Sequence, residues 1–383
     1  MSPVIDYAKA WDATYPEPAR GLRERPLVLL GPYSHLGGVY GPSIAQQCAN
    51  VVAVVDDHFR DEKIHGVVRW TSEQFRERAP AIRGLVGVDL AGSALGHTVF
   101  TALLADCGVE RADLVEVLAE LGLGAVYQSP HDMRVRTIAR QHEWQGLRGA
   151  LADESSRAAL DAALLLRLTY DRRVLRPAIT GPEDEYFSVH RNTSTFRLRD
   201  DEIVADCGAY IGSTVRKVVA ATDGKFRAIH AFEPDRKSYA ELEKLRAMRM
   251  PGIVLHNAAV GEASGSISFL ETGTMGSHVD MNAAAAGGDT PIVALDDVMD
   301  EVTFVKMDLE GYEQKALRGA ARLLRECRPR MAITAYHYAD DLLDLWRLFE
   351  ELVPDYELRL RHHSSYYYDT IFYAAPRERA RAA

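Results

Sequence analysis

Short apolar runs alternate with amphipathic stretches along most of this chain. Strands that alternate with helices are typical of a parallel sheet with crossover helices. In the N-terminal part the predicted strands are 27–30, 51–55 and 85–90, and the predicted helix is 96–107. We therefore expect a Rossmann-like α/β domain over residues 27–130, after a polar, proline-containing lead-in at 1–26.

The middle of the chain has a different pattern. Residues 131–185 lack β-branched runs and carry helical spacing, which predicts a helical connector. From 186 to 383 the alternation returns, and its last two strands are separated by a short polar loop that suits an antiparallel pair. The seven strands expected there are 203–205, 228–232, 253–256, 304–307, 331–334, 356–360 and 370–373, with extra strands at 266–269 and 290–295.

Composition and charge narrow the partners and the compartment. The net charge is −10 and no Lys- and Arg-rich run is interleaved with aromatics, which argues against nucleic acid. No apolar run could span a bilayer, so no membrane partner is expected, and the N-terminus lacks the pattern of a signal peptide. The four cysteines form no CxxC pair, which argues against zinc and disulfides. We expect a cytoplasmic protein.

One glycine-rich stretch carries the strongest chemical signal. Asp206-Cys-Gly-Ala-Tyr-Ile-Gly212 follows the apolar run 203–205 and precedes a predicted helix at 213–221. A strand, a glycine turn and a helix make a site for a nucleotide-like ligand, because the backbone can approach the ligand and the helix offers free N–H groups to an anion. Glu233 ends the next predicted strand, where an acid suits the two hydroxyls of a ribose.

Several blocks together carry a resemblance to a known family. They are Asp206 to Gly212, His230-Ala-Phe-Glu-Pro234, Asn257-Ala-Ala-Val-Gly261, Val305-Lys-Met-Asp-Leu-Glu-Gly-Tyr-Glu313 and the closing strands around 361–364 and 369–373. In this order they resemble the FkbM-type S-adenosylmethionine-dependent methyltransferases, over roughly residues 186–375. The resemblance implies a class I, Rossmann-like methyltransferase domain with a seven-stranded sheet. It also implies methyl transfer to a hydroxyl of a small metabolite, a sugar or a natural product.

The resemblance implies S-adenosylmethionine as cofactor and assigns contacts to it. The glycine turn would lie under the methionine part of the donor, Glu233 would bind the ribose, and the end of the third strand would face the adenine. The residues expected to contact the donor are Asp206, Gly208, Ala209, Tyr210, Gly212, Thr214, Glu233, Pro234, Asn257, Ala258 and Asp308.

The acceptor hydroxyl needs a base or a metal ion beside it. Asp308 ends an apolar strand at the ligand-binding edge, and His337 follows the next strand, so we expect Asp308 to touch the acceptor and His337 to be the base. His362 ranks second as base and His363 third. In an alternative, Asp308, Glu310 and His337 hold Mg²⁺ or Mn²⁺, and Glu313 steadies a helix start.

Other features are open to more than one interpretation. The tyrosines at 366–368 could stack on an acceptor, although packing is the favoured interpretation, and the low-complexity tract at 283–288 could be a lid or a surface loop. Residues 33–35 and 56–57 are weak candidates for acceptor recognition. The N-terminal domain could equally mediate a homodimer.

Two alternatives to a methyltransferase remain. One is a dinucleotide-dependent oxidoreductase that uses the N-terminal domain, but the turn after Leu30 lacks the GxGxxG pattern, and Pro32 removes an N–H there. The other is a non-catalytic, methyltransferase-like partner protein.

Overall fold

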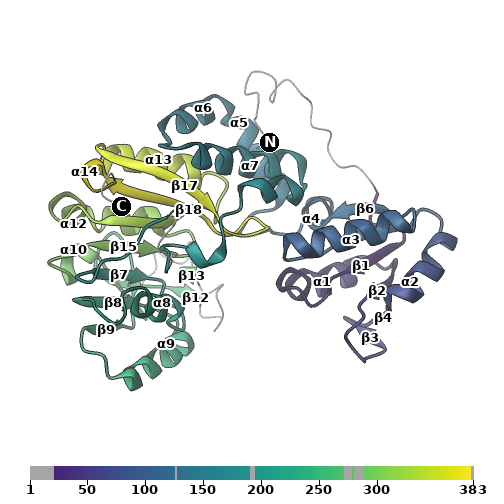
Figure 1. Ribbon diagram of the computed structural model, residues 1–383, viewed down its shortest axis with the longest axis horizontal. Helices are drawn as coiled ribbons and strands as arrows, with labels where there is room; N and C mark the ends of the chain where they lie inside the picture. Colours follow the sequence, from purple (N-terminus) through teal and green to yellow (C-terminus); the bar gives the residue numbers. More distant parts are fainter. Residues whose placement is uncertain (1–20, 126, 190–194, 271–277, 280–288, 381–383) are drawn as a thin grey trace. The chain divides into compact units, whose positions relative to one another are not determined.

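The computed structural model describes residues 21–125, 127–189, 195–270, 278–279 and 289–380 (Figure 1). The chain divides into two compact units. The first comprises Met1–Gln141, Ala158–Ile179 and Ser364–Tyr368, and the second comprises His142–Arg157, Thr180–His363 and Asp369–Ala383. The segment predicted as a connector, 131–185, is shared between the units, and the predicted lid at 283–288 lies outside the described residues.

The first unit contains a six-stranded sheet in the order β3-β4-β2-β1-β5-β6. All neighbours pair in parallel except β3, which is antiparallel to β4. From β1 the chain adds β2 and β4 on one side and then β5 and β6 on the other, so the sheet is doubly wound. The strands are β1 (Leu27–Leu30), β2 (Val51–Val55), β3 (Lys63–Ile64), β4 (Val67–Trp70), β5 (Val86–Asp89) and β6 (Glu110–Asp113).

Helices of the first unit follow the strands as crossover connections. They are α1 (His35–Gln47), α2 (Ser72–Arg78), α3 (Ala94–Asp106), α4 (Leu114–Leu121) and α5 (Pro130–Ala139), with most of α7 (Glu154–Thr169) and the 3-10 segments Ala79–Ala81 and Arg172–Ala178. All four residues of β1 are buried, as expected for a central parallel strand covered on both faces.

A buried network of charges lies at the carboxyl ends of β5 and β6. Arg172 is fully buried, and its guanidinium donates to Asp113 Oδ1 at 2.7 Å and to the carbonyl of Ala91 at 2.6 Å. Arg111 donates to both Asp89 and Asp113 at 2.8 Å. These partners satisfy carboxylates that would otherwise be costly to bury. They also accommodate a strand as polar as β6, which the hydrophobic pattern did not predict, at the edge of the sheet with its last two residues buried.

The second unit contains a seven-stranded sheet in the order β17-β18-β16-β15-β7-β8-β9. Only β18 is antiparallel to its neighbours. The strands are β7 (Ile203–Cys207), β8 (Ala228–Phe232), β9 (Ile253–His256), β15 (Phe304–Met307), β16 (Arg330–Thr334), β17 (Tyr356–His362) and β18 (Thr370–Pro376). The predicted strands are confirmed, and the fold class is the predicted one.

Further elements of the second unit surround this sheet. The helices are α6 (Gln141–Ala150), α8 (Ser213–Ala221), α9 (Arg236–Leu242), α10 (Leu295–Val298), α11 (Glu313–Arg318), α12 (Ala321–Glu326), α13 (Asp341–Leu352) and α14 (Arg377–Ala380), with 3-10 segments Pro182–Asp184 and Glu243–Met248. Small strands form two minor sheets: β10 (Ala259–Val260), β11 (Gly265–Ile267) and β14 (Thr290–Val293) in one, β12 (Phe269–Leu270) and β13 (His278–Val279) in the other.

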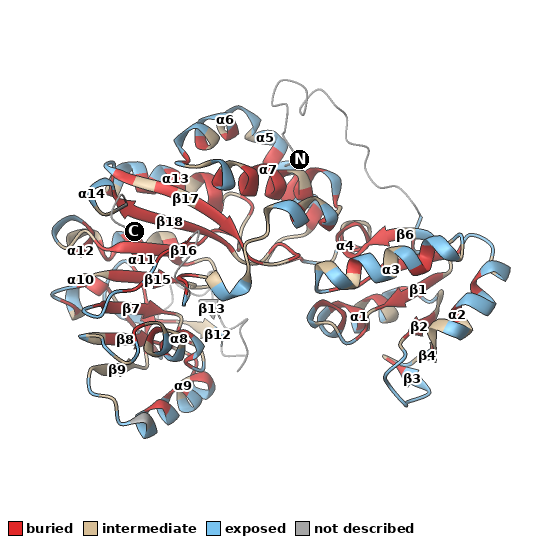
Figure 2. Ribbon diagram, viewed as in Figure 1, coloured by how far each residue is buried: buried red, intermediate tan, exposed pale blue. Residues whose placement is uncertain are grey.

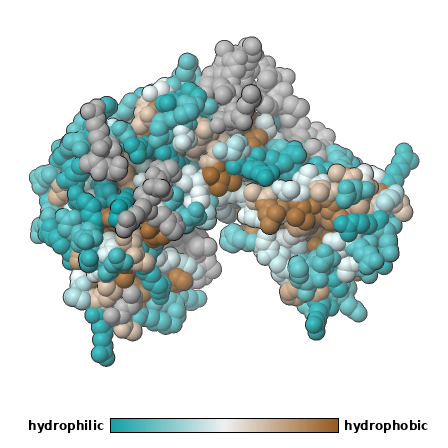
Figure 3. Space-filling view, in the orientation of Figure 1, coloured by the Kyte–Doolittle hydropathy of each residue, from teal (hydrophilic) through white to brown (hydrophobic). Residues whose placement is uncertain are grey.

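Burial follows the layers. Figure 2 shows the central strands of both main sheets as buried and the outer faces of the helices as exposed. None of the described helices combines the length and the hydropathy that a bilayer span requires. In Figure 3 hydrophobic side chains gather on the surface of the first unit around α3, whose Leu95 and Val99 are 75% and 52% exposed. That the N-terminal domain mediates a homodimer stays a prediction.

Replacing Arg172 tests whether the buried charge network stabilises the first unit. Arg172→Ala leaves Asp113 and the carbonyl of Ala91 without that donor in a buried site, and we expect a loss of about 3–5 kcal/mol in the free energy of unfolding. Urea unfolding measures it. The matched control is Arg173→Ala, because Arg173 is exposed and pairs only locally with Asp171, and it should cost less than about 1 kcal/mol. Equal stabilities would contradict the structural role.

Candidate functional site

The glycine turn after β7 lies at the point where the strand order of the second unit reverses. From β7 the chain goes to β8 and β9 on one side and later to β15 on the other, and ligands of open α/β sheets bind outside the carboxyl ends of such strands. Gly208 has a φ of +79°, and a Cβ there would lie 2.0 Å from the carbonyl oxygen of Asp308. Gly212 has a φ of +84° and a Cβ there would meet Leu245 at 2.6 Å. Both positions therefore require glycine.

Hydrogen bonds fix this turn against β8. The N–H groups of Gly208 and Ala209 both donate to the carbonyl of Phe232, at 3.0 and 2.9 Å. The N–H of Tyr210, whose φ is +49°, donates to Glu233 Oε2 at 2.7 Å. The turn thus leads directly into α8, where Gly212 is the N-cap and offers no side chain to the N–H groups of the first helical turn.

Lys306 is a functional residue that the sequence analysis missed. It lies on β15 and is almost fully buried, and its Nζ donates to the carbonyl oxygens of Gly208 at 2.6 Å and Cys207 at 3.3 Å. Nζ also lies 3.3 Å from Asp206 Oδ1. Burial alone would lower the pKa of Lys306, but the carboxylates of Asp206 and Asp308 hold it above its usual value. A lysine within the apolar strand 304–307 was the available signal, because an unpaired ammonium is almost never buried.

Glu233 lies at the end of β8, on one side of the turn. Its carboxylate accepts from the N–H groups of Tyr210 at 2.7 Å and Asp235 at 2.8 Å, one on each oxygen. Burial raises the pKa of Glu233 to about 7. A carboxylate has about four acceptor positions, so each oxygen keeps one for a further donor. Asn257 follows β9, and its amide nitrogen donates to the carbonyl of Glu233 at 2.8 Å, which ties the ends of the two strands together.

Asp308 lies on the other side of the turn, after β15. Its Oδ2 accepts from the hydroxyl of Tyr186 at 2.7 Å, and its Oδ1 lies 3.3 Å from the hydroxyl of Tyr336. The side chain of Asp308 is 20% exposed, so the carboxylate is held by protein on one side and open on another. The sequence analysis named neither tyrosine as a site residue, because Tyr186 lies outside every motif and Tyr336 has the position of an ordinary residue at the end of a strand.

His337 is fully buried between carboxylates. Its Nδ1 lies 3.2 Å from Glu313 Oε1, and its Nε2 lies 3.3 Å from Glu310 Oε2 and 3.5 Å from Asp308 Oδ1. Burial acts to lower the pKa of His337, but Glu313 and Glu310 raise it well above its usual value. Glu313 opens α11, and its carboxylate accepts from the N–H of Leu309 at 2.7 Å and the hydroxyl of Thr334 at 3.0 Å, both outside that helix, so its steadying of the helix start stays a prediction.

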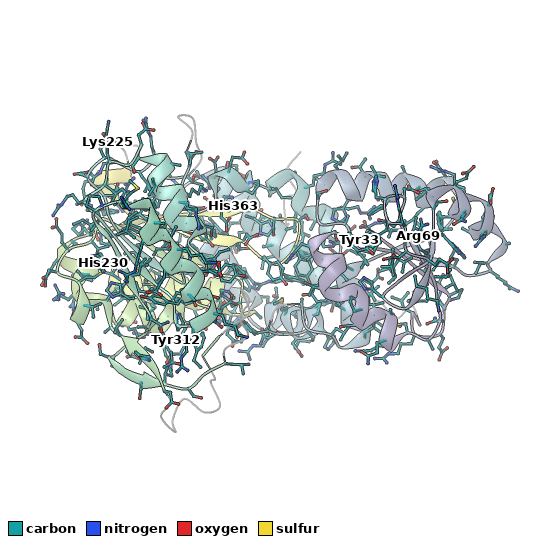
Figure 4. All side chains as sticks on the ribbon, turned by 90° about the horizontal axis from the view of Figure 1, so that it is seen from below. Tyr33, Arg69, Lys225, His230, Tyr312 and His363 are labelled. Carbon is teal, nitrogen blue, oxygen red and sulfur yellow. The ribbon has the colours of Figure 1, made fainter. Side chains whose placement is uncertain are left out.

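His362 and His363, the remaining candidates for the base, have hydrogen-bond partners other than Asp308. His362 pairs through Nδ1 with Thr370 Oγ1 at 2.9 Å, across the β17–β18 hairpin. His363, labelled in Figure 4, pairs through Nδ1 with the carbonyl of Gly181 and through Nε2 with the hydroxyl of Tyr373 at 2.8 Å. Burial lowers the pKa of His363 to about 4.

The aromatic and N-terminal candidates mostly serve local structure. Tyr366 and Tyr367 are 1% and 6% exposed, so packing, the favoured interpretation, is confirmed for them. In the first unit Ser34 caps α1, the carboxylate of Asp56 accepts from the N–H groups of residues 58 and 59, and Asp57 binds Ser72 at the start of α2. Tyr33 stacks on Phe59 at 4.1 Å.

A glycine turn at the switch point of a seven-stranded sheet with one antiparallel strand defines a class I methyltransferase fold. Residues 206–356 match the family described as the methyltransferase FkbM domain. Residues 206–356 thus match an FkbM methyltransferase domain, and the resemblance seen in the motifs is confirmed.

One solved structure supports this over most of the chain. The methyltransferase FkbM of Methylobacillus flagellatus KT is 26% identical, the match covers 96% of this chain and 97% of that one, and the TM-score is 0.78. An rRNA methylase from Streptococcus thermophilus is 15% identical over 46% of this chain and 87% of that one, with a TM-score of 0.31. A precorrin-6y C5,15-methyltransferase from Geobacter metallireducens is 14% identical, over 46% and 80%, with a TM-score of 0.28. No protein with a curated functional description matches the chain.

Gly208→Ala tests the packing of the turn against β15. The added Cβ would overlap the carbonyl oxygen of Asp308 at a φ that side chains rarely adopt, so we expect a loss of more than about 2 kcal/mol in stability. Scanning calorimetry of the full chain measures it. Gly149→Ala in α6 is the control, since a Cβ there meets nothing within 4 Å. A Gly208→Ala protein as stable as this control would show that the turn can move away from β15.

Proposed function

We propose that the second unit transfers a methyl group from S-adenosylmethionine to a hydroxyl of a small metabolite, a sugar or a natural product. The observation that carries the proposal is the placement of Glu233 and Asp308 on opposite sides of the Gly208 turn, one after β8 and the other after β15. In this order the ribose of the donor would lie beside Glu233 and its reacting methyl group beside Asp308, on the two sides of the same turn.

The donor half of the site is proposed to bind as follows. The ribose hydroxyls would donate to the two oxygens of Glu233, each of which has an acceptor position beyond its backbone partner. The carboxylate of the methionine part would meet the first-turn N–H groups of α8, a nine-residue helix whose N-cap, Gly212, leaves them without a side-chain acceptor. The turn residues hold the backbone close to the donor, as the sequence analysis expected.

Asp308 is proposed to face the acceptor and to receive its proton. The acceptor oxygen then attacks the methyl carbon, the carbon–sulfur bond breaks, and S-adenosylhomocysteine leaves with the electron pair. We assign the base to Asp308 rather than to His337, because the His337 ring is fully buried and both of its nitrogens face carboxylates of the protein. Asp308 keeps an exposed side, which an acceptor can reach.

The magnesium alternative concerns the cluster around His337. One ligand atom each of Asp308, Glu313 and His337 lies within 4.8 Å of the others. The carboxylates of Glu313 and Glu310 raise the pKa of His337 well above its usual value despite burial. In our proposal the cluster is an ion-paired histidinium, and the set Asp308, Glu310 and His337 around Mg²⁺ is the alternative.

Calorimetric titration tests the donor site directly. We expect S-adenosylmethionine and S-adenosylhomocysteine to bind one site and NAD not to bind, which separates the proposal from the oxidoreductase alternative. Glu233→Ala should weaken the binding of S-adenosylhomocysteine at least tenfold, because two ribose hydroxyls lose charged acceptors. Unchanged affinity in this variant would contradict the ribose role.

The same residue makes donor binding depend on pH. The pKa of Glu233 in the free protein is about 7, so the ionised acceptor is depleted as the pH falls below that value. The affinity for S-adenosylhomocysteine should therefore fall by up to about tenfold per pH unit below pH 7. In Glu233→Gln the affinity should be weaker but flat over this range. A pH dependence that persists in Glu233→Gln would assign it to another group.

Removal of divalent cations tests whether methyl transfer proceeds without a metal ion. We expect the rate of methyl transfer to change by less than about twofold after dialysis against a chelator, because the charges of the His337 cluster pair with one another. Transfer is measured with radiolabelled S-adenosylmethionine, before and after added Mg²⁺ or Mn²⁺. A large loss that Mg²⁺ restores would favour the cation alternative of the sequence analysis.

A further inference from the structure

Tyr186 reaches the acceptor side of the site from outside the segment that matches the FkbM family. It lies in the stretch between the 3-10 turn Pro182–Asp184 and β7, whereas the family match begins at residue 206. Tyr186 is 9% exposed, and its backbone φ is +61°. A bulky residue in this left-handed region costs roughly 1–3 kcal/mol, and such conformations persist only where surrounding contacts impose them.

Contacts impose the conformation of Tyr186 at three points. Its N–H donates to the hydroxyl of Tyr373 at 2.9 Å, and that hydroxyl lies 2.8 Å from Nε2 of His363. Its ring lies under the ammonium of Lys306, 5.1 Å from Nζ to the ring centroid. Its hydroxyl donates to Asp308 Oδ2 at 2.7 Å. Backbone, ring and hydroxyl are therefore all held, and all by residues of the second unit.

The geometry makes Tyr186 the link between the two halves of the site. Lys306 holds the carbonyl oxygens of the glycine turn, and Tyr186 contacts that ammonium with its ring and the carboxylate of Asp308 with its hydroxyl. With Tyr186 on Oδ2 and Tyr336 near Oδ1, each oxygen of Asp308 has one phenol partner. Rotation of the carboxylate would break the shorter of these hydrogen bonds.

We infer that Tyr186 is a positioning residue for methyl transfer, which fixes the orientation of the Asp308 carboxylate relative to the donor turn. The segment 180–188 is then part of the active site, although it precedes residues 206–356, which match the FkbM domain. The inference rests on the proposed function. In the reaction the acceptor hydroxyl gives its proton to Asp308 while its oxygen takes the methyl group from sulfur. Tyr186 keeps its own proton throughout and holds the oxygen that does not receive one.

The test compares Tyr186→Phe with Tyr356→Phe in the full chain. Both substitutions remove one phenol hydroxyl from a buried tyrosine of the second unit, but the hydroxyl of Tyr356 has no hydrogen-bond partner among the described residues. Radiolabelled S-adenosylmethionine is offered with a fixed panel of simple glycosides and phenols, and the best acceptor of the unmodified enzyme is used. S-adenosylhomocysteine binding is measured by calorimetry alongside.

We expect Tyr186→Phe to lower kcat about tenfold or more, because a misplaced reacting group costs rate rather than donor affinity. Its KM for the donor and its affinity for S-adenosylhomocysteine should stay within twofold. Tyr356→Phe should leave kcat, KM and affinity within twofold. In a crystal structure of Tyr186→Phe with S-adenosylhomocysteine, the Asp308 carboxylate should be rotated or spread over two conformers.

Two results would overturn the inference: an unchanged kcat in Tyr186→Phe, or an Asp308 carboxylate that keeps its orientation in that crystal structure. A parallel fall of affinity and kcat would also contradict it, since that outcome indicates a general structural role. Failure of the proposed function looks different. There the unmodified enzyme binds no S-adenosylhomocysteine or methylates no acceptor of the panel, while the orientation of Asp308 in the two proteins still decides the role of Tyr186.

Discussion

The ammonium of Lys306 is the interaction on which the site of the second unit depends. It crosses from β15 to β7 and holds two carbonyl oxygens of the glycine turn and the carboxylate of Asp206 at once. Removing one partner of such a buried pair typically costs about 3–5 kcal/mol, so the turn cannot relax away from β15 without a large penalty. The same strand continues into Asp308. The position of the turn and the position of the acidic group opposite it are therefore fixed by one strand.

Close packing at this point explains why so many site residues have unusual backbone conformations. Gly208, Tyr210, Gly212, Tyr186 and Glu310 all have positive φ values. Tyr210 and Glu310 carry side chains whose strain is compensated locally, the first by the bond from its N–H to Glu233 and the second by the ion pair with His337. Strain is thus concentrated where the backbone must turn sharply away from the carboxyl ends of β7 and β15, and hydrogen bonds of charged groups offset it.

The sequence predicts the architecture well because the central strands are continuous apolar runs bounded by polar turns. The element at 228–232 and the helix at 213–221 coincide with β8 and α8.

The features that the sequence analysis missed have a common cause. β6 can be polar because its Arg111 pairs with Asp89 and its Asp113 pairs with Arg172, partners that only the tertiary fold brings to the strand. Lys306, Tyr186 and Tyr336 were missed in the same way, since each acts through a partner distant in sequence. His337 was expected as a base because periodicity places it at a strand end but cannot show the carboxylates on both sides of its ring.

The balance of charge around Asp308 favours the donor that we propose. Asp308, Glu310 and Glu313 face one imidazolium, and Lys306 is already shared with Asp206. The acceptor side of the turn therefore carries an excess of negative charge in a partly buried setting, where charges interact more strongly than in water. In the proposed reaction a sulfonium would bring one positive charge to this place and lose it when the methyl group leaves, so its attraction to the carboxylates would be strongest before transfer. Neutral S-adenosylhomocysteine would then be held by Glu233 and the turn alone, which would favour release of the product over retention of it. Rigid placement of Asp308 by Tyr186 and Tyr336 would keep the negative charge beside the methyl carbon without letting the carboxylate itself swing into the line of attack.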